Sequence, residues 1–212
     1  MCHHYKGSRN PPAHLANEFS VRSNMYQLPL PDAGFYPLAL APIVRLNQAG
    51  DREMTAAQWG MLPSWWKPSV KAPKRTSYQR KCFNARCEDV DLKPTYREAF
   101  RRRRCLMPAD EFFEKGHYFH LPEFRPFAFA ALWERWRGAE GETVESCTLL
   151  TTEANETVRA VGHPRMPVVL TGEAAYARWL NTDLSGRAAF EPLLRPLPEG
   201  ELWTYAASAK TE

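Results

Sequence analysis

Eighteen prolines spread through 212 residues limit what this chain can fold into more than any other feature of its sequence. A proline inside a helix removes a backbone hydrogen bond and clashes with the preceding turn, so closely spaced prolines leave room only for short helices. Together with eleven glycines, they favour extended segments joined by stiff turns. Because 44% of the residues are hydrophobic, such segments can bury a substantial core. We therefore expect one domain over residues 1–212.

Short apolar runs rich in β-branched or aromatic residues outnumber the helical patterns. Helices are expected at 10–24, 94–104, 153–161, 171–180 and 184–194. Strands are expected at 41–47, 56–62, 104–121 in several pieces, 126–136, 146–152 and 166–170. Because strands and helices do not alternate regularly, the pattern favours an α+β fold with a curved, barrel-like, mostly antiparallel β core flanked by short helices.

Several classes of protein are excluded by composition and cysteine usage. No apolar run reaches the length of a membrane span, and the N-terminus lacks a secretory pattern. Five cysteines at irregular spacing do not form a disulfide framework, which favours a reduced cytoplasmic compartment. No second pair completes a zinc site with Cys82 and Cys87, so we expect buried thiols there, no metal and no cofactor.

The distribution of charge is more informative than the net charge of +4. Residues 54–87 contain no acidic residue and seven cations: Lys67, Lys71, Lys74, Arg75, Arg80, Lys81 and Arg86. Five aromatic residues are interleaved with them: Trp59, Trp65, Trp66, Tyr78 and Phe83. A second basic run occupies 101–104. Cations that follow phosphates and rings that stack on bases indicate single-stranded nucleic acid, although a solvated loop with core tryptophans has the same composition.

The N-terminal sequence MCHHYK places Cys2 directly after Met1. If Met1 is removed, Cys2 carries an α-amine and a thiol on adjacent carbons. An α-amine has a pKa of about 7.7–8.0, against about 10.4 for lysine, so it can attack an aldehyde near neutral pH. The thiol can then close a five-membered thiazolidine. Alternatives are a buried bystander, or a Cu(II) or Ni(II) site formed with the third-position His4 of the processed chain.

Three further segments carry candidate functional residues. In FNARCE, Asn84 can donate and accept hydrogen bonds while Arg86 can bind a phosphate. In PADEFFEKG, Glu114 follows two phenylalanines, and an apolar setting raises the pKa of a carboxylate towards a useful value for proton transfer. In GHPRMPVVL, His163 lies on a rigid turn before a strand, followed by a second candidate anion contact, Arg165.

These motifs occur in one order: MC, WGMLPSWW, FNARCE, RCLMPADEFFEKG, CTLLTTEANETV and HPRMPVVL. From Cys2 to about Leu180 the chain resembles the SRAP family, the SOS response-associated peptidase domain proteins. The resemblance implies a DNA-damage enzyme that binds single-stranded DNA containing an abasic site. It also implies that the processed cysteine and the ring-opened sugar aldehyde form a thiazolidine DNA–protein crosslink, which shields the lesion. A monomer in the bacterial cytoplasm, associated with the nucleoid, is implied as well.

The resemblance assigns roles residue by residue. Cys2 is the nucleophile, Asn84 positions the N-terminus or the sugar, and Glu114 and His163 transfer protons. The implied DNA contacts are Trp65, Trp66, Lys67, Arg86, Arg165 and His4. Many family members continue Cys-Gly-Arg-Phe, whereas here His3 and His4 follow Cys2, and Lys115 replaces an aromatic residue after the glutamate. The family also carries a peptidase label, so lyase- or hydrolase-type activity and an alternative N-terminal-nucleophile (auto)peptidase that uses Cys2 are both expected readings.

Overall fold

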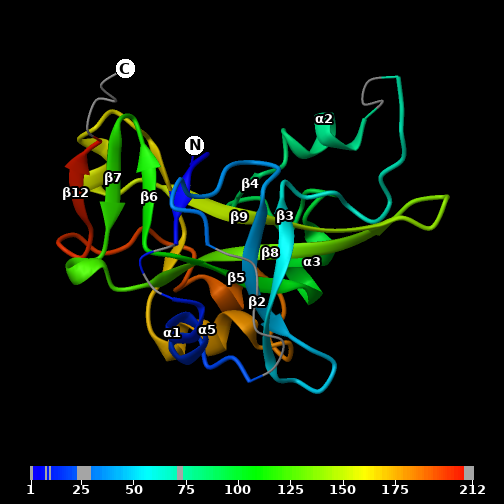
Figure 1. Cartoon of the computed structure of the whole chain (residues 1–212), viewed down its shortest axis with the longest axis horizontal. Coiled ribbons are helices and arrows are strands. Elements are labelled where there is room, and N and C mark those ends of the chain that lie inside the picture. The colour runs from blue at the N-terminus through cyan, green and yellow to red at the C-terminus, as the bar shows by residue number, and fades with distance from the viewer. Residues whose placement is uncertain (1, 8, 10, 23–29, 71–73, 208–212) are drawn as a thin grey trace.

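The computed structural model describes residues 2–7, 9, 11–22, 30–70 and 74–207, and its central feature is a closed five-stranded barrel (Figure 1). Four of the five strand pairings are antiparallel and one, between β3 and β9, is parallel. The barrel strands, in their order around it, are β9 (Thr143–Glu153), β3 (Arg52–Trp59), β2 (Leu40–Leu46), β5 (Arg104–Ala109) and β8 (Phe127–Arg137). The predicted barrel-like α+β fold is confirmed, whereas the extent of a single domain over 1–212 stays a prediction.

A second, smaller sheet lies at one end of the barrel (Figure 1). Its four antiparallel strands, in order, are β1 (Tyr5–Lys6), β6 (Glu111–Glu114), β7 (His117–His120) and β12 (Trp203–Ala206). The β6–β7 hairpin closes through Lys115 and Gly116, whose φ angles are 49° and 79°. Such a two-residue turn with positive φ matches the twist of the strands. It places Glu114 at the last position of β6.

Short strands and helices complete the structure around the barrel. The short strand β4 (Asn84–Arg86) runs parallel to β9, and β10 (Arg165–Pro167) pairs antiparallel with β9; β11 (Val169–Leu170) pairs with β8. The α-helices are α1 (Pro12–Glu18), α2 (Arg75–Gln79), α3 (Arg97–Arg102), α4 (Glu156–Arg159) and α5 (Glu173–Leu180). Two 3₁₀ helices span Pro122–Phe124 and Arg187–Phe190. No helix of the described residues is long and apolar enough to cross a membrane.

The strands β5 and β8 carry apolar residues on both faces because each face is covered. In β5, Cys105 and Met107 belong to the cluster inside the barrel, while Leu106 between them joins the cluster formed with the helices. In β8, Phe127 and Phe129 join the inner cluster, and Ala128 the outer one. This alternation is the period of two expected of a strand. It explains why these segments read as continuous apolar runs.

The predicted element boundaries hold less well than the fold. The helix expected at 10–24 spans only Pro12–Glu18, and residues 10, 23 and 24 lie outside the described ranges. The helix expected to begin at Pro94 begins at Arg97, and the one expected at 184–194 is a short 3₁₀ helix. The segment 166–170 is divided between β10 and β11, because Met166 and Pro167 pair with β9 whereas Val169 and Leu170 pair with β8.

Arg104 shows that the basic run 101–104 is not a uniform cationic surface. Its side chain is buried, and burial lowers its pKa to about 10. Its guanidinium donates to the carbonyls of Phe100, Arg101, Trp179, Asn181 and Leu184. Arg104 therefore ties the end of α3 to the segment that follows α5.

Replacing Arg104 with methionine is expected to lower the free energy of unfolding by about 3 kcal/mol, because several buried carbonyls lose their donor. Urea denaturation followed by circular dichroism measures this loss. The exposed Arg102 offers a matched control, whose Arg102→Met variant is expected to stay within about 0.5 kcal/mol of the parent. Equal stability of the two variants would contradict the structural role of Arg104.

Candidate active site around Cys2

The N-terminal segment is held as a strand on both of its sides. On one side Tyr5 pairs with Phe112 of β6, and the amide of Phe113 donates to the carbonyl of His4 at 3.0 Å. On the other side, Tyr5 and Phe35 exchange backbone hydrogen bonds of 3.3 and 2.8 Å. Gly34 makes this approach possible, because an added Cβ would lie 2.5 Å from the carbonyl oxygen of Tyr5. Residues 2–6 are thereby fixed beside β6.

Asn84 fixes Cys2 itself. The Asn84 Nδ2 donates to the carbonyl oxygen of Cys2 at 2.8 Å, and this bond joins two residues that are 82 positions apart. Asn84 begins β4, whose parallel pairing with β9 places it, and Tyr96 donates to its backbone carbonyl at 3.3 Å. Its Oδ1 is buried and accepts no hydrogen bond from the described residues. The side-chain amide of Asn84 thus holds the Cys2 backbone, and its Oδ1 stays available as an acceptor.

Glu114 and His163 face each other, with 3.5 Å between Oε2 and Nε2. The His163 Nδ1 lies 2.6 Å from the carbonyl oxygen of Arg165. Because a carbonyl only accepts, Nδ1 carries the proton and the lone pair of a neutral imidazole is on Nε2, towards Glu114. Burial raises the pKa of Glu114 to about 7 and lowers that of His163. A carboxyl group with a pKa of about 7, facing a neutral imidazole, suits general acid–base chemistry.

The Cys2 thiol is held in its protonated form. Its side chain is 1% exposed, and the thiol donates to the carbonyl of His4 at 3.4 Å. Burial, with the Glu114 charge adding to it, raises the pKa of this thiol. A thiolate is the nucleophilic form of cysteine, so Cys2 needs a base before its sulfur can attack. Such an environment does not favour a peptidase that begins with thiolate attack.

Arg86 lines an open cavity together with Asn84, and Trp65 contacts another residue of its lining, Pro94. This cavity, of about 400 Å³, is lined by Asn84, Arg86, Asp89, Lys93, Pro94, Thr95 and Tyr96. The Trp65 side chain is 53% exposed, and its Nε1 donates to the carbonyl of Pro94 at 3.2 Å. A cation and an exposed ring therefore adjoin the residue that holds Cys2, as binding of single-stranded DNA requires. Lys67 is exposed on the same loop.

The side chains of Trp66 and His4 are buried, whereas a contact with DNA requires an exposed side chain. Trp66 is buried, packs edge-on against Trp136 at 5.8 Å, and accepts a hydrogen bond from its Nε1. His4 is also buried: it stacks on Tyr36 at 4.3 Å, and its Nε2 contacts the carbonyl of Ala33 at 2.9 Å. Both side chains brace the segments that carry Trp65 and Cys2, so we retain Trp65 alone as the stacking ring of this loop.

Arg165 is engaged by an acidic partner. Its NH1 and NH2 donate to the two carboxylate oxygens of Glu88, each at 2.9 Å, and NH2 also donates to the carbonyl of Thr151 at 2.7 Å. A DNA phosphate can take the guanidinium only by displacing Glu88. Neither Glu88 nor Tyr96 was among the residues predicted to act. The sequence could have indicated Glu88, because it is the first acidic residue after the acid-free stretch 54–87. No pattern in the sequence indicates Tyr96.

Other candidate sites carry no comparable chemistry. All five cysteines are buried and free, including Cys82 and Cys87. Within the described ranges, no group of three or more His, Cys, Asp or Glu side chains is placed to hold a metal ion. The stretch 54–87 also includes Lys71, which lies outside the described residues.

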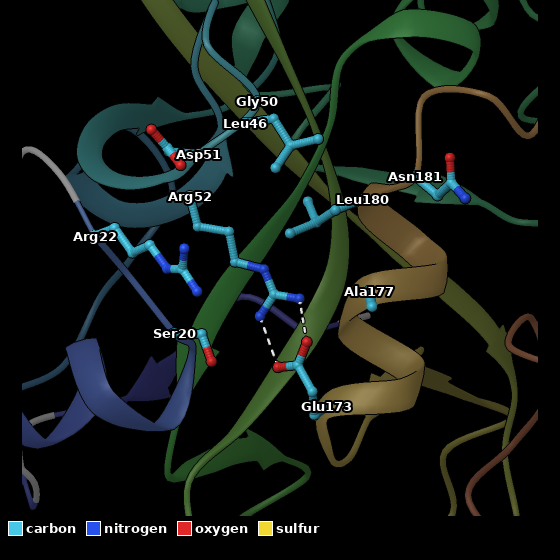
Figure 2. Close-up of a pocket in the computed structure, with 10 residues that line it drawn as sticks. All are labelled: Ser20, Arg22, Leu46, Gly50, Asp51, Arg52, Glu173, Ala177, Leu180 and Asn181. Carbon is cyan, nitrogen blue, oxygen red and sulfur yellow. Dashed lines mark hydrogen bonds and ion pairs between the residues drawn. The ribbon is translucent and has the colours of Figure 1, made fainter.

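A larger cavity of about 530 Å³ is lined by none of the residues predicted to act or to bind DNA (Figure 2). It lies between the segment after α1, the β2–β3 turn and α5, and Arg52 and Glu173 face each other across it in a two-bonded ion pair. Arg52 also donates to the carbonyl of Phe19 at 3.0 Å. This ion pair joins α5 to the barrel and to the end of α1. The charged residues at the cavity therefore have a structural role.

The chain is similar to two known abasic site processing proteins. The chain is 30% identical over 194 residues to the abasic site processing protein YoqW of Bacillus subtilis, covering 85% of this chain and 83% of that protein. It is 27% identical over 171 residues to the abasic site processing protein HMCES of Xenopus tropicalis, covering 68% of this chain and half of that protein.

Two solved bacterial proteins share the fold. One, from Bacteroides thetaiotaomicron, has a TM-score of 0.82 at 23% identity and covers 97% of this chain and 91% of its own. The other, from Bordetella bronchiseptica, has a TM-score of 0.78 at 26% identity and covers 98% of this chain and 100% of its own. The model of the SOS response associated peptidase family matches residues 1–211. The chain therefore belongs to the SOS response associated peptidase (SRAP) family.

Proposed function

We propose that this protein binds abasic sites in single-stranded DNA and crosslinks itself to them through the amine and thiol of Cys2 once Met1, which lies outside the described residues, has been removed. One observation carries the proposal: Asn84 holds the Cys2 backbone while Glu114, with its pKa raised to about 7, faces His163 beside the N-terminal strand. The named activity of YoqW and HMCES concerns the same lesion. We also propose action as a monomer at the nucleoid.

The first step joins the amine to the opened sugar. The Cys2 nitrogen attacks the C1′ aldehyde, a C–N bond forms, and the amine proton moves to the former carbonyl oxygen. Protonated Glu114 then gives its proton to this hydroxyl, which leaves as water, so an iminium remains beside the Glu114 carboxylate. A pKa near 7 leaves both forms of Glu114 accessible in this sequence of steps.

The second step closes the ring. The Glu114 carboxylate takes the proton of the Cys2 thiol, whose pKa is raised by burial, and the sulfur attacks the iminium carbon. The product is a thiazolidine with a neutral nitrogen, one water has been released overall, and Glu114 is again protonated. The neutral Nε2 of His163 can accept a hydrogen bond from protonated Glu114 and so holds this carboxyl group in place. Because the amine reacts first, a protonated thiol does not prevent the first step.

The DNA contacts follow from the same site. Arg86 and Lys93 adjoin Asn84 at the open cavity, where they can hold the phosphates next to the lesion, and Trp65 can stack on a neighbouring base. A peptidase that uses Cys2 remains the alternative class, but its first step needs the thiolate that burial disfavours. Lyase activity at the abasic site would require the iminium to eliminate the strand before the sulfur closes the ring.

The proposal is tested with Met1-processed protein and single-stranded DNA that contains one abasic site. A denaturing gel is expected to show a slower band with this DNA and none with the same sequence without the lesion. Intact mass of the free protein confirms that Met1 is absent. A processed protein that forms no band with the abasic strand would contradict the proposal.

Replacing Glu88 with glutamine is expected to strengthen binding of single-stranded DNA by about threefold to tenfold, because Arg165 loses its competing carboxylate. Fluorescence anisotropy over a series of salt concentrations measures the affinity, and the slope of log affinity against log salt should steepen. The exposed Glu98→Gln on α3 removes the same charge elsewhere and controls for net charge. Weaker binding by Glu88→Gln would mean that Glu88 positions Arg165 for DNA.

A further inference from the structure

The outer face of the small sheet carries a row of aromatic rings that the proposed chemistry does not use. Alternate residues of the four strands point to opposite faces. Tyr5, Phe112 and Phe119 pack into the barrel core. We call the opposite side the aromatic face. Its strand rings belong to Phe113, Tyr118, His120, Trp203 and Tyr205, and Tyr36 and Phe124 adjoin them from neighbouring segments, with the buried His4 joining Tyr36 to Phe113.

Ring contacts on the aromatic face are continuous from the reactive end of the chain to β12. Tyr36 stacks on His4 at 4.3 Å, and His4 contacts Phe113 at 5.7 Å. Phe113 contacts Tyr118 at 5.1 Å, and Tyr118 stacks on Tyr205 at 5.4 Å. The row then continues through His120, which lies 5.7 Å from Tyr205 and 6.2 Å from Trp203. The row therefore begins two residues from Cys2.

Three of these rings are exposed to solvent, whereas large aromatic side chains are usually buried in a core. Trp203 is 55% exposed, Tyr36 is 46% exposed and Tyr205 is 36% exposed. They include two of the four residues of β12, the edge strand of the small sheet, whose residues are all exposed. Clustered exposed rings on one face of a sheet are typical of an interaction surface.

The rings are held in fixed orientations before any partner arrives. The Tyr205 hydroxyl donates to the buried carboxylate of Glu111 at 2.6 Å, which fixes the ring against Tyr118. The Lys6 ammonium lies 4.1 Å from the centre of the Tyr118 ring and also pairs with Glu111. The Arg9 guanidinium lies 3.7 Å from the ring centre of Phe124. Stacking on preorganised rings costs little conformational entropy.

Position and charge indicate which partner this surface takes. The strand β1 and the adjoining Cys2 lie between β6 of the small sheet on one side and β4 on the other (Figure 1). A strand whose abasic site reaches Cys2 has one flank towards Arg86 and Trp65 and the other towards the aromatic face. Rings interleaved with cations bind unpaired bases by stacking. Because Glu111 offsets one of the two cations, Lys6 and Arg9, stacking rather than phosphate neutralisation must dominate here.

We propose that the aromatic face stacks the bases of one flank of the DNA strand, while the other flank follows Arg86 and Trp65. This inference rests on the proposed function, because it takes Cys2 as the position of the lesion. It predicts that affinity depends on one flank through base stacking with a shallow salt dependence, and on the other flank through phosphates with a steep one.

Binding to an aldehyde-free abasic analogue tests the inference without the crosslink. Oligonucleotides carry the analogue at the 5′ end, at the 3′ end or centrally, and fluorescence anisotropy gives their affinities. The double variant Trp203→Ala, Tyr205→Ala is expected to lose about tenfold or more in affinity for one terminal analogue and for the central one. Its affinity for the opposite terminal analogue should be unchanged. Leu92→Ala, which removes an exposed apolar side chain elsewhere, should bind like the parent.

The outcomes separate this inference from the proposed function. Equal losses with both terminal analogues, or no loss with either, would overturn the stacking role of the aromatic face. A folded parent protein that binds as expected but forms no crosslink with an abasic aldehyde would contradict the proposed function and leave the stacking result standing. If the double variant is unstable by circular dichroism, Trp203→Ala alone on the exposed edge strand gives the same comparison.

Discussion

Replacing Cys2 with alanine is expected to remove the stable adduct with abasic DNA entirely, a loss of more than about 1,000-fold, or about 4 kcal/mol. The variant keeps an α-amine, so it can form an imine but cannot close the ring. Borohydride should therefore trap a product with Cys2→Ala that the denaturing gel does not show otherwise. Cys2→Ser should behave in the same way, because its hydroxyl is a far weaker nucleophile than a thiol.

Binding separates this chemical role from a structural one. The Cys2 side chain is 1% exposed, so Cys2→Ala is expected to bind an aldehyde-free abasic analogue within about twofold of the parent. Both variants require intact-mass proof that Met1 has been removed, because an unprocessed chain cannot react. A stable adduct that persists in processed Cys2→Ala would show that another residue is the nucleophile.

Replacing Glu114 with glutamine is expected to slow crosslinking by about 100-fold, the size of effect usual for loss of a general acid–base group. The parent rate should follow a bell-shaped pH profile, because the amine must be unprotonated while Glu114, with its pKa of about 7, must be protonated. In Glu114→Gln the alkaline limb should disappear. Quenched time courses on denaturing gels measure both rates. An unchanged rate and profile would remove Glu114 from the mechanism.

The Glu114→Gln substitution is expected to raise the stability of the fold at alkaline pH although it slows the reaction. Burial raises the pKa of Glu114 above its unfolded value, so its contribution to stability is full in acid and is lost as pH rises through about 7. Glu114→Gln is therefore expected to be more stable than the parent at pH 8 by about 1–2 kcal/mol and to gain nothing at pH 4. Urea titrations at both pH values measure the difference, with the exposed Glu98→Gln as a control.

The fold was predictable where local patterns decide it. The prolines and the apolar runs at 41–47, 126–136 and 146–152 predicted strands that the structure contains, because their side chains are buried on both faces. The closure of the barrel was not predictable. It depends on the parallel pairing of Trp59 with Cys147, which are far apart in sequence and carry no local signal. Helix boundaries failed for a similar reason, since packing and not propensity sets them.

The candidate site was predictable in chemistry and not in geometry. The amine–thiol pair of Cys2 and the carboxyl among phenylalanines at Glu114 followed from residue type and neighbours. The bond from Asn84 to the Cys2 backbone did not, because it joins β4 to the N-terminal segment through tertiary structure. The sequence also misled about two cations: Arg104 of the basic run 101–104 is buried among carbonyls, and Arg165 is already paired with Glu88. Charge counts cannot distinguish a cation that faces DNA from one that is used inside the fold.

The intact mass of the crosslinked product tests the central claim most directly. Met1-processed protein is incubated with a short single strand that carries one abasic site, and half of the sample is treated with borohydride before mass spectrometry. A thiazolidine predicts the summed masses of protein and DNA less one water, unchanged by borohydride. An adduct that gains two hydrogens on reduction, or no adduct at all, would contradict ring closure by the Cys2 thiol.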